Sequence, residues 1–404
     1  MTEPLPGPEP DPPLPPGTRS RTARGLTAAA AEGRFALQVC ADCATVIYPP
    51  RDACPRCLSP RLPFKEVPSG GVLLAATTIH ASTDAYFRDR LPWRIGTVQL
   101  DSGPTILAHL HRELRDGERV RMALKLDKSG SAVAFALPAT ETPDMTEDPQ
   151  WRELTADPKQ RGVLVTDGRG AVGQAVAAAL SEAEASRVLV GIADQAKPFG
   201  GEAALRRTAR VEIVPLDLTD AGSVATLAGA IGSEVDIIVN TAEHVRAGGI
   251  IEPESMVLAR AAMDIRYFGL MRLAQAFAPV LRARSAASGN PAAAFVNLLS
   301  VYALTSWPAY GAFAATEAAC LSATQALRAA LRPAGIKVVS VFSGPLETEA
   351  FHHLPPPKVA PAALARATVD ALRRGLEDVF VGDVAEDIRA RLAVNPKALE
   401  RELE

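Results

Sequence analysis

The chain has 404 residues, enough for two or three domains, and 48% of them are hydrophobic, enough to fill globular cores. Its formal net charge of −3 and its pI near 6.1 argue against a basic surface that binds nucleic acid or an anionic membrane. No apolar run is long enough to cross a bilayer, and the first residues lack the pattern of a secretory signal, so we expect a cytoplasmic protein with no membrane contact.

The first predicted segment is a proline-rich tail, residues 1–19. Eight prolines fall within residues 1–17, and almost nothing there is apolar enough to bury. This composition is typical of a disordered chain with partial polyproline II character. Residues 21–38 are rich in alanine and arginine, and we expect them to form a helix.

Four of the five cysteines follow, in the segment CADCATVIYPPRDACPRC. Two Cys-x2-Cys pairs place four thiolates at two turns, a spacing that suits one tetrahedral Zn²⁺, and a reducing cytoplasm disfavours disulfides between them. A shell of four thiolates leaves no position for water, so we expect a structural zinc, with iron as the alternative in the same geometry. The predicted ligands are Cys40, Cys43, Cys54 and Cys57.

Short β-rich runs separated by turn sequences occupy residues 70–138. Strands at this spacing predict a small closed barrel. The runs are GVLLAATTIHA, RIGTVQL, TILAHLH, RVRMALKL and SAVAFAL, and the turns between them contain DSG, RDGE and DKSG.

The order of helix, cysteine pairs with YPPR between them, and a barrel containing LPWRIGTVQLD resembles the rubredoxin-like zinc-ribbon plus OB-fold proteins that accompany thiolases and thiolase-like aldolases. The resemblance covers about residues 25–138. It implies a helix and zinc ribbon over 20–62, an OB-fold over 63–140, a thiolase or aldolase partner, and a bound acyl-CoA. OB-folds also bind single-stranded nucleic acid, but basic and aromatic residues alternate little here, so we expect none.

Residues 141–160 are acidic, contain three prolines and show no long apolar period, so we expect a linker. From Gly162 onward, apolar strands alternate with alanine-rich helices, which predicts a parallel sheet covered by helices on both faces. The predicted fold class is therefore multidomain: a zinc ribbon plus a small β-barrel, then an α/β Rossmann-type doubly wound sheet over residues 161–404.

The segment VLVTDGRGAVG reads as a strand, a glycine-rich turn and a helix. Glycines at such a turn allow a pyrophosphate to approach the helix N-terminus, and acidic residues after the next strands suit the ribose and the adenine of a dinucleotide. The candidate cofactor-binding residues are Gly168, Gly170, Gly173, Asp194, Asp217 and Asn240.

Residues 161–404 resemble the short-chain dehydrogenases/reductases, through the glycine turn, Asn240 after the fourth strand, NLLS ending at Ser300, and the helix containing AYGAFAATEAA. The family's cofactor is NAD(P), but Asp167 adds a carboxylate to the phosphate turn, and Glu243 stands where the family has glycine. NAD(P) binding is therefore doubtful. The resemblance also implies dimerisation, as a homodimer or a heterodimer, through helices spanning about 257–283 and 309–332.

The catalytic positions depart further from the family. Ser300 matches the family's serine, but Phe313 stands at the tyrosine position, Glu317 at the lysine position and Arg266 at the asparagine position. The tyrosine exchanges a proton with the substrate, and the neighbouring lysine lowers its pKa. Phenylalanine has no proton to give, so we expect no catalytic set here, and we expect Arg266 and Glu317 to form a salt bridge in its place.

Three functions remain open. The first is a non-catalytic scaffold or accessory subunit that binds a thiolase or thiolase-like aldolase and helps to bind an acyl-CoA. The second is an NAD(P)-dependent 3-hydroxyacyl-CoA-type dehydrogenase with substituted catalytic residues, and the third is a nucleotide or acyl-CoA sensor. Arg88, Arg94 and Arg112 suit coenzyme A phosphates or a solvated face equally well. The acyl group, the pathway and the partner are not specified by the sequence.

Overall fold

The computed structural model describes residues 12–17, 20–141, 145–251, 255–286 and 292–403. Most of the predicted tail, residues 1–19, lies outside the described residues. The chain divides into two compact units, one made of Pro12–Asp157 with Arg373–Leu376 and the other of Pro158–Leu372 with Glu377–Glu404. Within the described residues, no helix is both long and apolar enough to cross a membrane.

The N-terminal helix is shorter than the sequence predicts. It ends at Ala31, and Gly33 then adopts a φ of +71°, a left-handed conformation that terminates helices. The rest of the predicted 21–38 helix is a turn followed by a strand, because Ala36–Val39 pair with two further strands of the ribbon. The elements are α1 (Arg24–Ala31), β1 (Ala36–Val39), β2 (Val46–Ile47) and β3 (Phe64–Glu66), in the sheet order β2-β1-β3.

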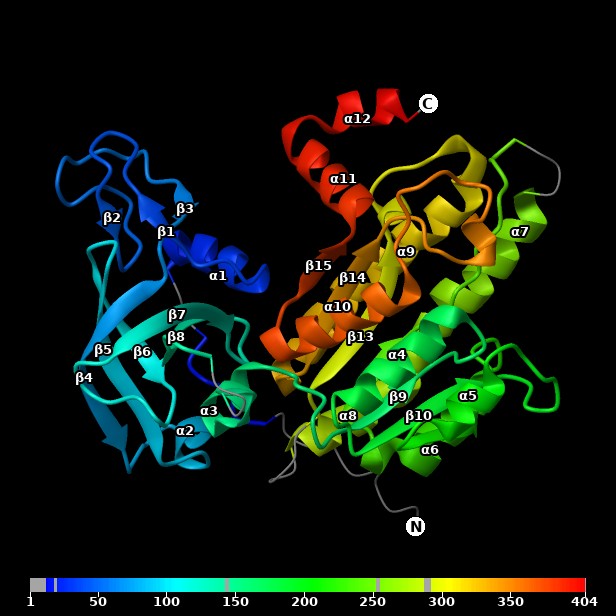
Figure 1. Cartoon of the computed structure of the whole chain (residues 1–404), viewed down its shortest axis with the longest axis horizontal. Coiled ribbons are helices and arrows are strands. Elements are labelled where there is room, and N and C mark those ends of the chain that lie inside the picture. Colours follow the sequence, from blue (N-terminus) through cyan, green and yellow to red (C-terminus); the bar gives the residue numbers. More distant parts are fainter. Residues whose placement is uncertain (1–11, 18–19, 142–144, 252–254, 287–291, 404) are drawn as a thin grey trace, which may run out of the picture. The chain divides into compact units, whose positions relative to one another are not determined.

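The predicted barrel is confirmed, and its strands close in the order β4-β5-β6-β8-β7 (Figure 1). Alternate side chains point inward, so that Leu73, Val98 and Ile106 are fully buried in one core. The short helix α2 (Ala85–Arg88) lies between the first two strands in the sequence. The strands are β4 (Gly70–Ile79), β5 (Trp93–Leu100), β6 (Thr105–Leu110), β7 (Arg119–Leu126) and β8 (Ala132–Pro138).

The segment 141–160 differs from the expected linker. It contains α3 (Pro149–Leu154), capped by the Asp148 carboxylate, which accepts a hydrogen bond from the Trp151 backbone N–H. The ring of Trp151 is buried with its centroid 5.2 Å from that of Phe135 in β8. Because a six-residue helix is too short to show an apolar period, the sequence hides this packing. Residues 142–144 lie outside the described residues.

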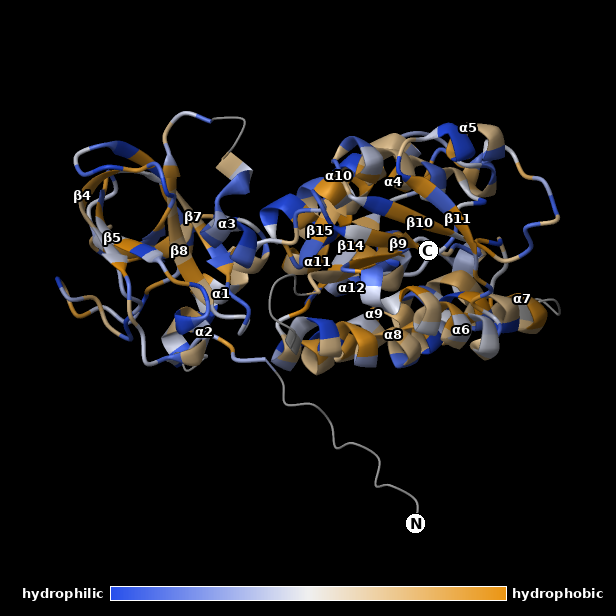
Figure 2. Ribbon diagram, turned by 90° about the horizontal axis from the view of Figure 1, so that it is seen from below, coloured by the Kyte–Doolittle hydropathy of each residue, from blue (hydrophilic) through white to orange (hydrophobic). Residues whose placement is uncertain are grey.

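The second unit is built on a seven-stranded parallel sheet in the order β11-β10-β9-β12-β13-β14-β15. The sheet forms the apolar middle layer, with α4, α5 and α10 on one face and α6, α7, α8 and α9 on the other (Figure 2). The strands are β9 (Gly162–Val165), β10 (Arg187–Ile192), β11 (Val211–Pro215), β12 (Ile237–Asn240), β13 (Ala294–Ser300), β14 (Lys337–Ser343) and β15 (Asp378–Val381).

Two long helical segments flank the carboxyl end of β13. The first runs through α7 (Ser255–Ala262), a π-helical stretch (Met263–Phe268) and α8 (Gly269–Ala286), and the second is α9 (Gly311–Leu331). The π-helical stretch carries Arg266, and such stretches often coincide with functional sites. The remaining helices are α4 (Ala171–Glu182), α5 (Glu202–Arg207), α6 (Ala221–Ile231), α10 (Pro361–Arg374), α11 (Asp383–Val394) and α12 (Pro396–Glu402).

Candidate functional site

The four cysteines of the ribbon form a compact cluster of thiols. All four Sγ atoms lie within 4.8 Å of one another, with Cys40 and Cys57 at 3.5 Å and Cys43 and Cys54 at 3.6 Å. A tetrahedral Zn²⁺ with Zn–S bonds of about 2.3 Å separates its sulfur ligands by about 3.8 Å. The observed spacing therefore fits zinc, and none of these cysteines forms a disulfide.

Two matching turns place these thiols. Ala44 N–H donates to the Cys40 carbonyl, and Leu58 N–H donates to the Cys54 carbonyl, both over about one turn. Ala44 and Leu58 each adopt a positive φ, 56° and 59°, which closes the turn behind its cysteine pair. The four thiolates would hold the ion in a closed shell, so the metal would stabilise the fold and activate no water.

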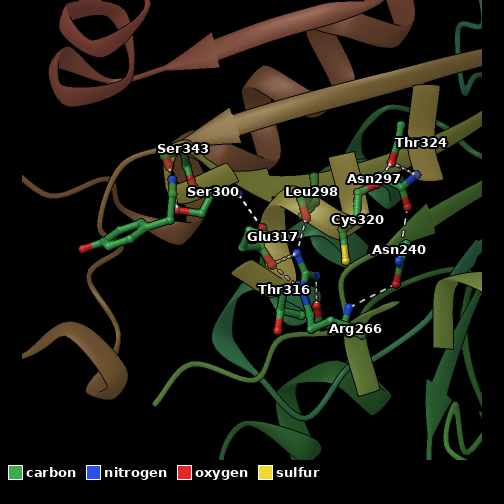
Figure 3. Close-up of polar contacts among 12 residues, drawn as sticks. Asn240, Arg266, Asn297, Leu298, Ser300, Thr316, Glu317, Cys320, Thr324 and Ser343 are labelled. Carbon is green, nitrogen blue, oxygen red and sulfur yellow. Dashed lines mark hydrogen bonds and ion pairs between the residues drawn. The ribbon is translucent and has the colours of Figure 1, made fainter. Parts of the chain in front are cut away.

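In the second unit, Arg266 and Glu317 meet at the end of β13, as the sequence predicts. Arg266 Nε and Nη2 lie 2.8 Å and 2.6 Å from Glu317 Oε1, and the two side chains are 6% and 0% exposed. The other carboxylate oxygen, Glu317 Oε2, accepts a 2.8 Å hydrogen bond from Ser300 N–H. The guanidinium also donates to the carbonyls of Ala242 and Leu298 (Figure 3).

In this arrangement, each of the two buried charges has the other as its counter-charge and has hydrogen-bond partners on the backbone. Burial disfavours the charged form of Arg266, but Glu317 beside it raises the pKa of the guanidinium overall. A buried ion pair persists only when its remaining donors and acceptors are bonded, and here backbone groups at the ends of β12 and β13 bond them.

A small cavity of about 40 Å³ adjoins the pair. Arg266, Glu317, Ser300 and Phe313 line it together with Ser343 at the end of β14. Its volume holds about two or three water molecules, far less than the roughly 300–1,000 Å³ of a small-molecule cleft. Ser300 Oγ donates to the Ser343 carbonyl at 3.4 Å and accepts from Tyr302 N–H, so its hydroxyl is used in local structure.

The glycine-rich turn lies where predicted, after β9 at the start of α4. A Cβ at Gly168 would stand 2.2 Å from Val190 Cγ1, and one at Gly173 would stand 1.7 Å from the Asp167 carbonyl oxygen. These two positions therefore require glycine for close packing. A Cβ at Gly170 would meet nothing within 4 Å.

Asp167 places its own carboxylate in this turn. Its Oδ1 accepts a 2.9 Å hydrogen bond from Arg169 N–H, and its backbone is tied to Thr241 Oγ1. Burial raises the pKa of the Asp167 carboxyl, although the Arg169 N–H and the Arg169 charge oppose that shift. The carboxylate thus uses a backbone donor of the kind that binds phosphate in dinucleotide-binding turns.

The other predicted cofactor residues follow neighbouring strands. Asp194 follows β10 and pairs with Lys197 at 3.1 Å, which lowers the pKa of its carboxyl. Asp217 follows β11 and accepts hydrogen bonds from the N–H and the hydroxyl of Thr219. Both side chains are therefore engaged locally, and the Arg169 guanidinium donates to the carbonyls of Asp194 and Lys197.

Asn240 belongs to a buried hydrogen-bond chain. Its Oδ1 accepts from Thr166 Oγ1 at 2.9 Å, and its Nδ2 donates to Asn297 Oδ1 at 3.2 Å. Asn297 in turn donates to Thr324 Oγ1 in α9 (Figure 3). The chain links β9, β12, β13 and α9, so Asn240 is structural in this geometry.

Glu243 adds a further carboxyl near the pair. Burial raises its pKa, Arg266 lowers it, and Glu317 and Asp167 raise it further. Glu243 and Glu317 thus both act on the Arg266 guanidinium, and Asp167 lies close enough to act on Glu243, so this group of acidic side chains disfavours an anionic ligand here.

Two contacts in the structure do not follow from the sequence. Tyr310 Oη lies 2.7 Å from His353 Nε2, which brings together a helix start and a loop far along the chain. Arg94, a candidate for coenzyme A phosphates, instead donates to the carbonyls of His111, Arg112 and Leu114. No sequence pattern signals either contact, because each depends on tertiary pairing.

The fold and the cysteine cluster define a fusion of a zinc-ribbon/OB-fold protein with a short-chain dehydrogenase fold. Residues 27–63 match a family model described as the ChsH2 rubredoxin-like zinc ribbon domain, and residues 64–125 match the ChsH2 C-terminal OB-fold domain. Residues 168–379, more than half of the chain, match the model described as enoyl-(acyl carrier protein) reductase, and the chain belongs to this short-chain dehydrogenase/reductase family.

Individual relatives agree with this assignment. A short-chain dehydrogenase from Burkholderia cenocepacia, solved in complex with NADP, is 30% identical, covers 61% of this chain and 98% of its own, and has a TM-score of 0.54. The short-chain dehydrogenase PC-15 of Penicillium crustosum is 28% identical over 38% of this chain and 56% of its own length. The 1-deoxy-11-beta-hydroxypentalenate dehydrogenase of Streptomyces avermitilis is 29% identical over 49% and 73%. The chain spans about half the length of the first curated relatives it matches.

Proposed function

We propose that this chain is an accessory subunit without dehydrogenase chemistry of its own. In this proposal the ribbon and the barrel bind a thiolase or thiolase-like aldolase in the cytoplasm and help to hold its acyl-CoA. The dehydrogenase-like unit contributes folded surface, with its long helical segments available for homodimer or heterodimer formation.

The observation that carries the proposal is the buried Arg266–Glu317 pair beside Phe313. Hydride transfer from an alcohol needs a group that takes the hydroxyl proton, and a phenol does this near neutral pH only beside a cation. Phe313 offers no proton, and Glu317 puts a carboxylate where the family has that cation. The catalytic pair is replaced by an ion pair of the chain itself.

The phosphate turn supports the same conclusion. The Asp167 carboxylate already accepts from Arg169 N–H, so a pyrophosphate would meet both a used donor and a negative group. We therefore expect NAD⁺ and NADP⁺ to bind weakly. The zinc-compatible thiol cluster and the ChsH2 family matches support the assignment of partner and acyl-CoA binding to the first unit.

Calorimetry with NAD⁺, NADP⁺ and a series of acyl-CoAs tests the proposal directly. We expect an acyl-CoA to bind and neither dinucleotide to bind tightly. Co-purification with a thiolase or aldolase encoded beside this chain tests the partner. Tight dinucleotide binding together with hydroxyacyl-CoA-dependent reduction of NAD⁺ would reject the proposal.

A second function, an NAD(P)-dependent 3-hydroxyacyl-CoA-type dehydrogenase, is favoured by one observation. The Tyr310–His353 contact at 2.7 Å forms a proton-exchanging pair three residues before Phe313. If this pair acts as the base, the wild type reduces NAD(P)⁺ with a hydroxyacyl-CoA, and Tyr310→Phe abolishes that activity. In the accessory-subunit proposal neither protein shows turnover.

A further inference from the structure

The first unit also contains a cavity, which lies beside the barrel and is separate from the cysteine cluster. It measures about 210 Å³, and its walls include Tyr86, Phe87, Trp93 and His109 together with Pro15 and Pro16 from the start of the chain. The aromatic rings meet edge to face, with centroids 5.2 Å apart for Tyr86 and Phe87 and 5.4 Å apart for Phe87 and Trp93. The chain thus brings prolines against an aromatic wall.

The aromatic wall is held in place by polar contacts at its back. Trp93 Nε1 donates to His109 Nδ1 at 2.8 Å, which fixes the indole against β6. Tyr86 Oη donates to Glu153 Oε2 at 3.3 Å, and the Arg90 guanidinium lies 4.0 Å from the centre of the Tyr86 ring. With residues 12–17 in place, Tyr86 and Trp93 are only 2% and 3% exposed, and these polar contacts from β6, Glu153 and Arg90 hold the two rings in position.

The segment Pro12–Gly17, with the sequence PPLPPG, forms neither helix nor strand. Pro15 is buried and Pro12 and Leu14 are half-buried, whereas Pro13, Pro16 and Gly17 are exposed. Four prolines within six residues favour the polyproline II conformation, which proline-rich chains adopt without internal hydrogen bonds. Ser131 Oγ donates to the Gly17 carbonyl at 3.4 Å and ties the end of the segment to the barrel.

We propose that this aromatic pocket is a binding site for a polyproline II segment and that residues 12–17 are its ligand within the same chain. Aromatic grooves recognise such segments because the extended helix is already ordered and its rings pack on flat side chains. A ligand tethered nearby has a high effective concentration, so the chain's own segment excludes a similar one supplied in solution. This inference does not depend on the proposed partner or on acyl-CoA binding.

The test compares three full-length proteins. In one variant, Pro12, Pro13, Pro15 and Pro16 are changed to Ala, which weakens the internal ligand. A matched control carries the same changes at Pro4, Pro6, Pro8 and Pro10. A synthetic PPLPPG peptide is titrated into each protein by calorimetry, and far-UV circular dichroism and bound zinc per chain report whether each protein is folded.

We expect the first variant to bind the peptide at least about tenfold more tightly than the wild type, and the control to behave as the wild type does. Two substitutions, each added to the first variant, test whether the aromatic rings bind the peptide. Trp93→Ala removes a ring and should lower peptide affinity about tenfold. Tyr86→Phe keeps the ring and should leave peptide affinity nearly unchanged. The inference is overturned if all three proteins bind PPLPPG with equal affinity, or if the peptide AALAAG binds as tightly as PPLPPG. It is also overturned if the first variant binds an acyl-CoA but no peptide.

Discussion

At the scale of single residues, the Arg266–Glu317 pair permits a sharp prediction. Glu317→Gln leaves a buried guanidinium without its counter-charge and should lower the free energy of unfolding by about 3–5 kcal/mol. Glu202→Gln breaks the more exposed pair with Arg206 in α5 and should cost about 1 kcal/mol or less. Denaturant unfolding followed by circular dichroism measures both.

A double variant separates the pair from the packing around it. Replacing Arg266 with Met and Glu317 with Leu removes both charges at similar volume, so the double variant should be more stable than Glu317→Gln. If the single and double variants are equally unstable, the loss arises from packing rather than from an unpaired charge.

Asp167 makes stability depend on pH. Burial raises the pKa of its carboxyl in the folded chain above the usual value of 3.8, so folding favours the protonated form. Its contribution, measured against Asp167→Asn, should be greatest below that usual value and should fall as pH rises through the folded pKa. We subtract the unfolding free energy of Asp167→Asn from that of the wild type at about pH 5 and at about pH 8, and we expect the smaller value at about pH 8. A larger value at about pH 8 would contradict the assignment.

Much of the candidate site follows from residue types at fixed spacings. The cysteine pairs predict a thiol cluster because each pair closes a local turn, and opposite charges at 266 and 317 predict an ion pair because the family fold brings those positions together. The partners that complete the pair, the carbonyls of Ala242 and Leu298, carry no side-chain signal. Backbone partners of this kind follow only from the folded chain.

At the scale of elements, the turn between β9 and α4 has no room for a side chain at Gly173 but has room for one at Gly170. Gly173→Ala would drive a Cβ against the Asp167 carbonyl and should cost about 1–3 kcal/mol or more. Gly170→Ala points into open space and should cost about 1 kcal/mol or less, as a change of helix N-cap. Equal melting temperatures for the two variants would contradict this packing.

The periodic strands and the long helices are predictable from the sequence, whereas short elements are not. Six of the seven parallel strands of the second unit coincide with apolar runs, because a strand covered on both faces leaves little choice of residue. β15 (Asp378–Val381) is the seventh strand and was not predicted. The end of α1 was misplaced because Gly33, rather than the alanine-rich composition, decides where that helix stops.

At the scale of the whole molecule, the two compact units should respond separately to loss of metal. Cys54→Ser removes one of four thiolates and should abolish binding of about one zinc ion per chain. Amide exchange should then rise in β1, β2 and β3 and stay unchanged in β9 and β12 of the other unit. Zinc analysis and hydrogen-exchange mass spectrometry measure the two effects.

Cys320→Ser is the matched control, because Cys320 lies in α9 and takes no part in the thiol cluster. It should retain zinc and leave exchange in the ribbon unchanged. Equal zinc content in the two variants would show that the cluster does not bind the metal.

The buried pair in the second unit also constrains how this chain can change over generations. Changing Glu317 to lysine while Arg266 remains would place two buried cations together. Changing Arg266 to asparagine while Glu317 remains would leave a buried carboxylate without its counter-charge. Either single step is costly, so the two positions must change together or through a neutral intermediate. A chain with the family's residues at 266, 313 and 317 is therefore separated from this one by several changes that must occur together, and single substitutions do not connect the two.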